Sequence, residues 1–451
     1  MRGPNTVDVN AFLNDGKMGA YQWLLLALCF LTIAADGMDV AIMGFLAPAI
    51  LEEWGVSRAS FGMVMSAAPI GLVLGALLAG PLSDRWGRKK VLITSVLLFG
   101  LFTLLSAGAT SLTELALARL LCGLGLGAAM PNASTLLSEY APERSRSLLI
   151  TVMFTGFNLG SAVVGFAAAY LLPLHGWRSV LLLGGAVPLC LVPLLILLLP
   201  ESARFMLAKG QPAQRIAATL NRVCGAAFAA DTSFTTSEAK VQVTTPIRTL
   251  FTSPYIRTTL SLWVTYFMGL LVIYLLTGWL PTLIKDAGLP ISRAASITAM
   301  FQVGGTVGAV LVGWAMDRSH KTRVIAGAYL AGGLAVILLA WGGILSEQIG
   351  WYVAAAGFFM SGAQTGLNAY APSCYPTLAR ATGVSWMLGI GRLGSISGAL
   401  IGGLLLSLGW GFAGVLSLLV VPALLAAVAI TQSVRRASST EMRPISTPAR
   451  T

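Results

Sequence analysis

Long apolar stretches recur along the whole chain, and they limit its fold more than any other feature. Each is close to the 20 or so helical residues that the hydrocarbon core of a bilayer requires. Only 10% of the residues are charged, against about 25% in a soluble domain. The sequence therefore predicts an all-α membrane protein with twelve transmembrane helices. We place them near residues 21–50, 59–80, 91–109, 112–137, 147–172, 178–199, 258–284, 292–316, 323–345, 350–371, 382–408 and 410–432.

One long polar segment, residues 200–257, divides these stretches into two sets of six. The chain ends are also polar, and residues 1–20 lack the apolar core of a signal peptide. We therefore expect five regions. They are an N-terminal tail at 1–20, a six-helix bundle at 21–199, a central linker at 200–257, a second six-helix bundle at 258–432 and a C-terminal tail at 433–451.

The distribution of Lys and Arg predicts the orientation in the membrane. If the N-terminus is cytoplasmic, 23 of the 29 Lys and Arg residues fall in cytoplasmic segments and four in outer loops. Cytoplasmic loops of membrane proteins carry this excess of positive charge. We therefore expect both termini in the cytoplasm. The net charge of +12 then reflects membrane topology, and no nucleic-acid partner is needed to explain it.

The two halves of the chain repeat each other. GPLSDRWGRKKVL from Gly80 matches GWAMDRSHKTRVI from Gly313, at an offset of 233 residues. NLGS at Asn158 matches RLGS at Arg392, at an offset of 234. Such repeats predict two pseudo-symmetric bundles with a substrate site between them, near the middle of the membrane.

Several of these motifs resemble those of a known transporter family. The segment from Gly80 to Lys90 resembles the loop 2–3 signature of the major facilitator superfamily, and RLLCGLGLGAA from Arg119 resembles its fourth-helix signature. Within that superfamily, DGMDVAIMGFLAP from Asp36, PESARF from Pro200 and GIGRLG from Gly389 are similar to segments of the aromatic acid:proton symporters. The resemblance implies a monomeric importer in the bacterial inner membrane that carries an aromatic carboxylate together with protons.

Two carboxylates, Asp36 and Asp39, lie within the first apolar stretch, and Arg119 lies within the fourth. A charged side chain in the bilayer core is costly, so it must face a cavity or a partner. Two coupled carboxylates beside one Arg can bind and release a proton as their surroundings change. We interpret the three as the proton-coupling residues. A static ion pair between helices is the alternative, and the sequence does not rank the two aspartates.

Arg392 is the second basic residue inside an apolar stretch. Acidic residues in the C-terminal bundle occur only near the expected helix ends, so a local counter-ion is not evident. A guanidinium is a planar fork that binds carboxylates through two hydrogen bonds. We expect Arg392 to bind the substrate carboxylate, with pairing across the two bundles as the alternative.

Polar and aromatic side chains in the apolar stretches can surround an aromatic ring. Ring contacts contribute about 0.5–1.5 kcal/mol each beyond simple burial. Most membrane-embedded aromatic residues only pack against neighbours, so no single one is decisive. The substrate-binding residues that we expect besides Arg392 are Asn158, Tyr266, Tyr274, Asn368 and Trp386.

The loops that follow the second and fourth apolar stretches carry a set of charges that we assign to gating. Asp84, Arg85 and Arg88 belong to the loop 2–3 motif, and Glu139 and Arg144 flank the next cytoplasmic loop. The resemblance implies that Asp84 docks at the start of the eleventh helix when the transporter faces outward. A helix N-terminus attracts a carboxylate in this way.

Other functions fit the sequence less well. The two His residues lie in expected loops, the five Cys form no CxxC pair, and no zinc-enzyme or phosphate-loop motif occurs. We therefore expect no enzyme, no metal site and no cofactor, with the proton as coupling ion. A proton-coupled importer of another organic acid or of a sugar, or a proton-antiport exporter, remains an alternative. The ring substituents of the substrate, the proton stoichiometry and the oligomeric state are not determined.

Overall fold

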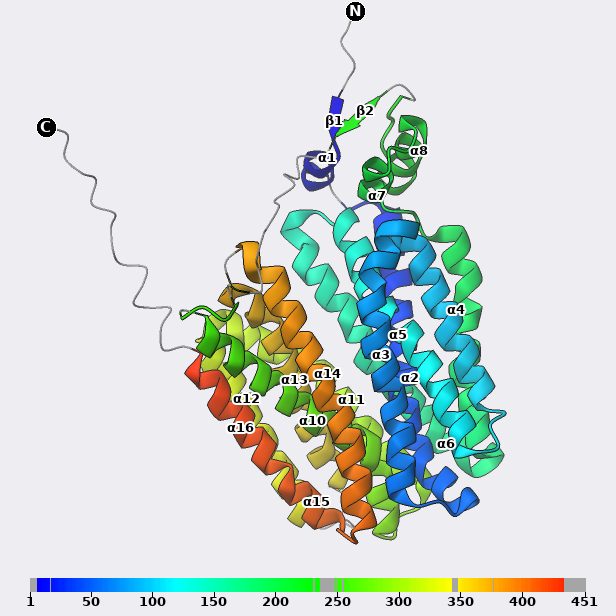
Figure 1. Cartoon of the computed structure of the whole chain (residues 1–451), viewed down its shortest axis with the longest axis vertical. Helices are drawn as coiled ribbons and strands as arrows, with labels where there is room; N and C mark the ends of the chain where they lie inside the picture. Colours follow the sequence, from blue (N-terminus) through cyan, green and yellow to red (C-terminus); the bar gives the residue numbers. More distant parts are fainter. Residues whose placement is uncertain are drawn as a thin grey trace, which may run out of the picture.

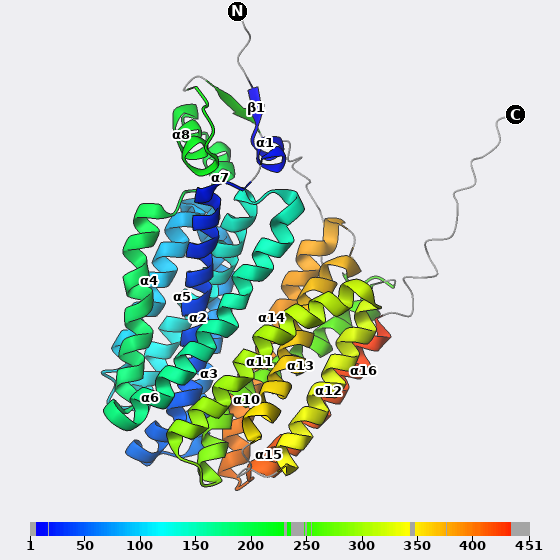
Figure 2. The same cartoon turned by 180° about the vertical axis from the view of Figure 1, so that it is seen from behind.

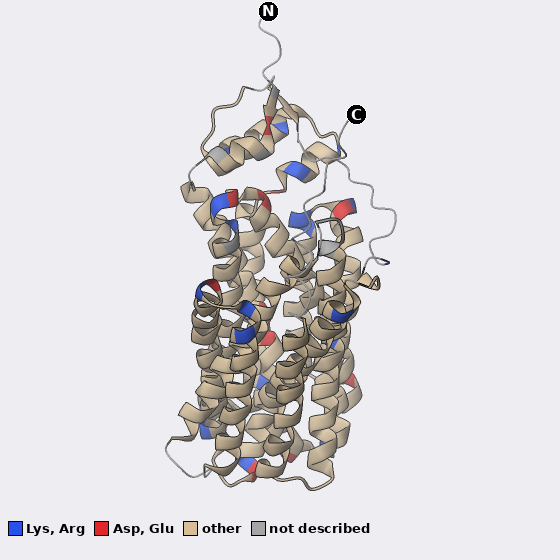
Figure 3. Ribbon diagram, turned by 90° about the vertical axis from the view of Figure 1, so that its left-hand side faces the viewer, with Lys and Arg blue, Asp and Glu red and all other residues tan. Residues whose placement is uncertain are grey.

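The structure is a computed structural model that describes residues 6–16, 18–229, 232–235, 248, 250–253, 255–342, 348–375 and 377–433. Most of these residues are helical, and the long helices form two groups that lie side by side (Figure 1). Apart from Ser433, the expected C-terminal tail falls outside the described residues. Lys, Arg, Asp and Glu residues are more frequent toward the two ends of the bundle than between them (Figure 3).

The N-terminal half contains five long helical segments. Ser57 and Ser111 begin two of them, because each hydroxyl accepts a hydrogen bond from a backbone N–H in the first turn. Gly176, at φ 73° and ψ 177°, interrupts the longest segment and divides it into two membrane passes. The segments are α2 (Ala20–Trp54), α3 (Arg58–Trp86), α4 (Arg88–Ser106), α5 (Leu112–Tyr140) and α6 (Glu143–Leu198).

The C-terminal half repeats this plan. Its last pass is built from two helices that adjoin at Leu419, and a short 3₁₀ turn, Ala371–Cys374, precedes α14. The helices are α10 (Ile256–Asp286), α11 (Ile291–Arg318), α12 (Lys321–Trp341), α13 (Ile349–Tyr370), α14 (Thr377–Ser407), α15 (Phe412–Leu418) and α16 (Val420–Gln432).

The described helices account for twelve membrane passes. Ten helical segments are long and apolar enough to cross a membrane, and α6 counts as two passes. The twelfth is α13, which has 22 residues and packs against α11 and α12. It contains two polar amide side chains, Gln364 and Asn368. The prediction of an all-α membrane protein with twelve transmembrane helices is confirmed.

The two halves meet along three pairs of helices, α2 with α10, α3 with α14 and α6 with α11. They approach most closely at the end formed by the α2–α3 and α10–α11 turns, which we call the distal end. There a Cβ on Gly44 would lie 2.2 Å from the backbone oxygen of Thr277. Toward the opposite end, which carries α7 (Ala203–Ala208) and α8 (Ala213–Cys224), the halves diverge (Figures 1 and 2).

Two ion pairs join the N-terminal half to the C-terminal half at the distal end. Arg58 of α3 pairs with Asp286 of α10 at 2.5 Å, and Lys285 pairs with Glu52 of α2. Both pairs join one half to the other. Exposed pairs of this kind contribute little individually, about 0–1 kcal/mol. Together with the close helix contacts, they hold the distal end shut.

The N-terminal segment is folded, although the sequence indicates only a polar tail. β1 (Thr6–Asp8) pairs in parallel with β2 (Ser233–Thr235) of the central linker, and α1 (Val9–Asp15) follows β1. Val9 and Leu13 are buried in a core shared with α8 (Ala213–Cys224). The segment thus joins the linker, whose other helix is α7 (Ala203–Ala208), in a small cap on the N-terminal half (Figure 1).

Candidate functional site

Asp39 and Arg119 form a buried ion pair inside the N-terminal half. Arg119 Nη2 donates to Asp39 Oδ2 at 2.6 Å and Nη1 donates to Oδ1 at 3.1 Å, so the contact is bidentate. The hydroxyl of Thr103 also donates to the Asp39 carboxylate, and Cys122 Sγ lies 2.9 Å from Oδ2. Asp39 is 0% exposed and Arg119 is 1% exposed. Because both carboxylate oxygens have partners, this pair holds α2 to α5.

Asp36 lies one turn earlier on α2 and is equally buried, at 1% exposure. Its Oδ1 has no hydrogen-bond partner among the described residues. The positive charge that acts on it is that of Arg392, which belongs to the other half of the protein, although the two side chains form no ion pair among the described residues. The two aspartates therefore differ in surroundings. Asp39 is neutralised within its own half, whereas Asp36 interacts with a charge across the interface.

Arg392 lies at the middle of α14 and is half-buried. Its Nη1 donates to the hydroxyl of Tyr274 on α10 at 3.2 Å. The ionisable groups that influence the guanidinium are Tyr274, Tyr266 and Asp36. Of these only Asp36 is a carboxylic acid. Arg392 thus faces a neutral phenol on its own half and an acid on the other half.

A polar group extends from Arg392 into the C-terminal half. The ring of Tyr266 packs against Gly391, where a Cβ would lie 1.9 Å from Tyr266 Cδ1. The side chains of Asn368 and Gln364 of α13 lie near the Tyr266 hydroxyl. Gln364 was not among the residues expected from the sequence. The signal was available, because Gln364 and Asn368 are four residues apart in an otherwise apolar helix and so share one face.

Asn158 lies on the stretch of α6 that packs against α2 next to Asp36, whereas Trp386 is separated from Arg392 along α14. Asn158 is half-buried on α6, next to Phe157, whose backbone packs against Gly37 of α2. Trp386 stacks on Trp263 with ring centroids 5.8 Å apart. It lies six residues before Arg392 on α14, about 9 Å along the axis. From Arg392, Trp386 lies toward the α7–α8 end of the protein.

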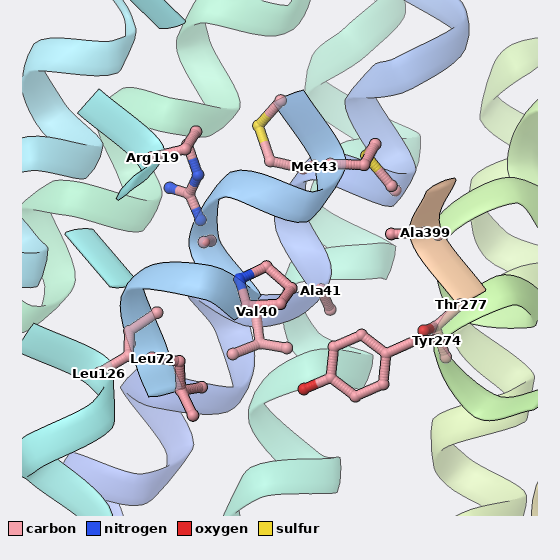
Figure 4. Close-up of a pocket in the computed structure, with 14 residues that line it drawn as sticks. Val40, Ala41, Met43, Leu72, Arg119, Leu126, Tyr274, Thr277 and Ala399 are labelled. Atoms are coloured by element: carbon pink, nitrogen blue, oxygen red, sulfur yellow. The ribbon is translucent and has the colours of Figure 1, made fainter. Parts of the chain in front are cut away.

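The interface is closed on the distal side of these residues. A cavity of about 30 Å³ remains between α2, α3, α5, α10 and α14, lined by Val40, Gly44, Tyr274 and Gly278 among others. The side chain of Tyr274 reaches from α10 toward Val40 and Leu72 (Figure 4). This volume is about one water molecule's share of the liquid, whereas a cavity of roughly 150 Å³ holds benzene. No aromatic ring fits there in this conformation.

Three of the five expected gating residues, Asp84, Arg88 and Glu139, lie together at the α7–α8 end. Arg88 lies 3.2 Å from Asp84 Oδ1 and 3.7 Å from Glu139 Oε1, and it stacks over the ring of Phe205. Among the described residues, the ion pairs of Asp84 are limited to Arg88, and its side chain is 74% exposed. Glu139 is buried, so Arg88 links an exposed carboxylate to a buried one.

Arg85 and Arg144 do not join this cluster. Arg85 is exposed at the end of α3. Arg144 donates from Nη2 to the backbone oxygen of Gly16 at 3.1 Å, which ties the N-terminal segment to the start of α6. Next to it, the backbone N–H of Glu143 donates to Asn14 Oδ1 at 3.0 Å. Arg144 thus contacts the cap. The sequence predicted neither this contact nor the cap itself.

Glu201 is a further residue of this end that the sequence analysis did not select. Its Oε1 accepts a hydrogen bond from the backbone N–H of Lys89 at 3.2 Å, at the N-terminus of α4. Gly87, at φ 99°, allows this approach, because a Cβ there would lie 2.2 Å from Glu201 Oε2. The sequence did contain a signal, because Glu201 lies in the PESARF segment from Pro200. That segment entered the sequence analysis only as a mark of family resemblance. Glu201 anchors the linker to loop 2–3.

These residues can bind an anion and exchange a proton. Arg392 supplies a permanent positive charge, Asp36 supplies an ionisable acid opposite it, and Tyr274 and Tyr266 supply hydroxyl groups beside it. Among the described residues, no group of three or more His, Cys, Asp or Glu side chains could hold a metal ion. The arrangement therefore suits noncovalent binding of a small anion.

Comparison with known proteins places this arrangement in a family. The profile of the Major Facilitator Superfamily matches residues 28–376. The chain is 58% identical to the gallate transporter of Pseudomonas putida, over 94% of each chain. It is 51% identical to the 4-hydroxybenzoate transporter PcaK of Pseudomonas aeruginosa, over 94% of this chain and 95% of that one.

A solved structure shares the fold at low sequence identity. It is the inward open conformation of the xylose transporter XylE from E. coli, with a TM-score of 0.72. The match covers 92% of this chain and 96% of that chain, and the two sequences are 16% identical. This likeness supports the arrangement of the helices and carries no information on the substrate.

Proposed function

Since the chain belongs to the Major Facilitator Superfamily, and within it to the group that contains gallate and 4-hydroxybenzoate transporters, we propose that it is a proton-coupled importer of an aromatic carboxylate. The family makes it a membrane transporter and not an enzyme. The observation that carries the proposal is the buried Asp36 carboxyl, whose Oδ1 has no partner among the described residues and on which the charge of Arg392 in the other half acts. It brings an acid and a fixed positive charge to one place, where a proton and an anion can be exchanged.

Arg392 binds the substrate carboxylate in this proposal. In the structure its guanidinium donates to one phenol, at 3.2 Å from Tyr274, and retains further N–H groups. A carboxylate can accept two of these in parallel. Tyr266 and Asn368 on the C-terminal half and Asn158 on the N-terminal half then surround the ring. A ligand that contacts both halves can drive their closure.

Asp36 carries the proton. When it is ionised, it competes with the substrate carboxylate for the charge of Arg392. When it is protonated, this competition ends and the substrate binds more tightly. Substrate and proton thus favour each other's binding, which is the linkage that symport requires. Asp39, already paired with Arg119, supports the position of α2.

The orientation follows from the charge distribution. The excess of Lys and Arg in one set of loops favours cytoplasmic termini, so the α7–α8 end faces the cytoplasm and the distal end faces outward. The closed distal end then corresponds to a transporter that faces inward. Return to the outward-facing state requires the Arg58–Asp286 and Lys285–Glu52 pairs to separate. Asp84, Arg88 and Glu139 act at the cytoplasmic gate. A monomer is sufficient for this cycle.

Uptake by the purified protein in liposomes tests the proposal. Radiolabelled 4-hydroxybenzoate is offered with and without an inward proton gradient, and benzoate, gallate, protocatechuate, xylose and succinate are added as competitors. We expect accumulation only with the gradient, and competition by the aromatic acids alone. Competition by xylose or succinate without uptake of any aromatic acid would favour a sugar or dicarboxylate importer. Accumulation driven by an outward gradient would indicate an exporter.

A further inference from the structure

Gln364 is a buried amide whose hydrogen bonds are incomplete. It lies on α13 and is 7% exposed. Its Oε1 accepts a hydrogen bond from the Tyr329 hydroxyl at 2.7 Å. Its Nε2 has no hydrogen-bond partner among the described residues. A buried donor without a partner costs about 1–3 kcal/mol, so a protein rarely retains one unless something else binds there.

Neighbouring helices hold Gln364 in place. Gly269 of α10 leaves room for it, because a Cβ there would lie 2.2 Å from Gln364 Oε1 and 2.5 Å from the Tyr329 oxygen. Tyr329 is itself fully buried on α12. The amide is thus fixed at its oxygen, and its nitrogen is left as a free donor in a defined position.

The free donor lies beside the carboxylate site proposed above. Tyr266 connects them, because its ring packs against Gly391, next to Arg392, and its hydroxyl lies near Gln364 and Asn368 without a hydrogen bond to the Gln364 amide nitrogen. On α10, Gly269 beside Gln364 and Tyr274 beside Arg392 are five residues apart, about 7.5 Å along the axis. A hydroxybenzoate can bridge this spacing, with its carboxylate at one end and a ring hydroxyl at the other.

We propose that Gln364, with Tyr266 and Asn368, forms a subsite for a ring hydroxyl group and makes the protein selective for hydroxylated aromatic acids. The Gln364 amide nitrogen donates to the hydroxyl oxygen, and the hydroxyl proton goes to the Asn368 side-chain oxygen or to Tyr266. An unsubstituted ring leaves these groups unpaired in a buried place. Sites built to hydrogen-bond a hydroxyl reject analogues that lack it for this reason.

The inference rests on the proposed function, because it assumes that Arg392 binds the carboxylate of an aromatic acid. The test compares dissociation constants of the detergent-solubilised protein for benzoate and 4-hydroxybenzoate. The variant is the double substitution Gln364→Met with Tyr329→Phe, which removes both hydrogen-bonding partners and leaves neither one unpaired. A second variant, Tyr266→Phe, keeps the ring against Gly391 and removes only the hydroxyl. Tyr375→Phe is the matched control, because it removes a buried hydroxyl that contacts Thr259, outside the subsite.

We expect the wild type to bind 4-hydroxybenzoate at least about tenfold more tightly than benzoate, as expected for the loss of one buried hydrogen bond. The double variant should lose most of this ratio through weaker 4-hydroxybenzoate binding, with benzoate binding changed less than about twofold. Tyr266→Phe should partly reduce the ratio of the benzoate to the 4-hydroxybenzoate dissociation constant. Tyr375→Phe should leave this ratio unchanged.

Three results would overturn the subsite. Equal binding of the two acids by the wild type would show that no hydroxyl is recognised. An equal loss for both acids in the double variant would assign Gln364 a structural role alone. If the double variant does not fold, an unchanged ratio in Tyr266→Phe decides against the subsite. Absence of binding by any aromatic acid would instead contradict the proposed function itself.

Discussion

Asp39 and Arg119 form a bidentate ion pair whose shorter contact is 2.6 Å, and both side chains are buried within one half of the protein. Asp36, one turn away on the same helix, forms no ion pair among the described residues, and the charge that acts on it is that of Arg392 in the other half. An ion pair within one half is carried along as a unit when the halves move. An interaction between the halves is made and broken in the transport cycle. We therefore expect substitutions at the two aspartates to have different consequences.

Substitution of Asp39 should mainly lower stability. Asp39→Asn leaves the Arg119 guanidinium buried without its counter-ion, which costs about 3–5 kcal/mol. We expect a lower melting temperature and little properly folded protein in detergent. The variant that removes both charges, Asp39→Asn with Arg119→Gln, should regain part of the stability. Wild-type melting behaviour of Asp39→Asn alone would show that the pair does not stabilise the fold.

Substitution of Asp36 should abolish coupling and preserve folding. Asp36→Asn resembles the protonated acid, so Arg392 is always free for the substrate. We expect substrate binding that no longer depends on pH near neutrality, and exchange of labelled for unlabelled substrate that continues. Accumulation against a gradient should be lost. Measurement of the dissociation constant at several pH values, together with uptake, tests both points, and continued proton-driven accumulation would remove Asp36 from the proton pathway.

Replacement of Arg392 should weaken substrate binding even when its charge is kept. Arg392→Lys retains a positive charge but replaces the planar fork with a single ammonium group. We expect the dissociation constant for an aromatic acid to rise about tenfold, because one of two parallel hydrogen bonds is lost. Arg318→Lys is the control, since Arg318 stacks on Trp314 at the end of α11. An unchanged affinity in Arg392→Lys would exclude Arg392 from the carboxylate site.

Removal of an aromatic ring contact should make the N-terminal cap open more often. Phe12 packs edge to face on Phe228 with ring centroids 4.9 Å apart. Phe12→Ala removes about 1 kcal/mol of contact energy, which raises the population of the open cap about fivefold. Hydrogen exchange in residues 9–15 measures the change. Phe359→Ala, which removes a similar pair in α13, should leave exchange in the cap unaltered. Equal hydrogen exchange of residues 9–15 in Phe12→Ala and Phe359→Ala would show that Phe12 does not stabilise the closed cap.

The number and kind of helices could be predicted from the sequence because the bilayer acts on each segment separately. A stretch of about 20 apolar residues is helical in a membrane whatever its neighbours are. The folded cap could not be predicted in this way. β1 and β2 have three residues each and are more than 200 residues apart, so neither segment carries a strand signal of its own.

The candidate site was predictable only at the level of residue types. Buried charges in apolar helices indicated Asp36, Asp39, Arg119 and Arg392, because a charge in the bilayer needs a partner. Which charges are partners depends on how α5 and α14 pack against α2, and that is a tertiary property. The amide of Gln364 was overlooked because a single polar residue in a membrane helix is a weak signal without the pattern that Asn368 completes.

Closure of the distal end should depend on Gly44, because its Cα lies against the backbone of α10. A methyl group at this position would lie 2.2 Å from the Thr277 oxygen, and a backbone atom cannot move aside as a side chain can. Gly44→Ala should therefore hold the distal end open and reduce uptake about tenfold or more, as an obstructed conformational step limits transport. Substrate binding should persist.

Labelling of a cysteine at the distal interface measures this opening directly. Met65 lines the closed distal cavity, so Met65→Cys, in a background without the native cysteines, should react slowly with a membrane-impermeant maleimide. Addition of Gly44→Ala should make it react rapidly. Gly327→Ala is the matched control, because no atom lies within 4 Å of a Cβ at that position. Slow labelling and normal uptake in Gly44→Ala would mean that the two halves can close without this contact, and the glycine would then serve packing alone.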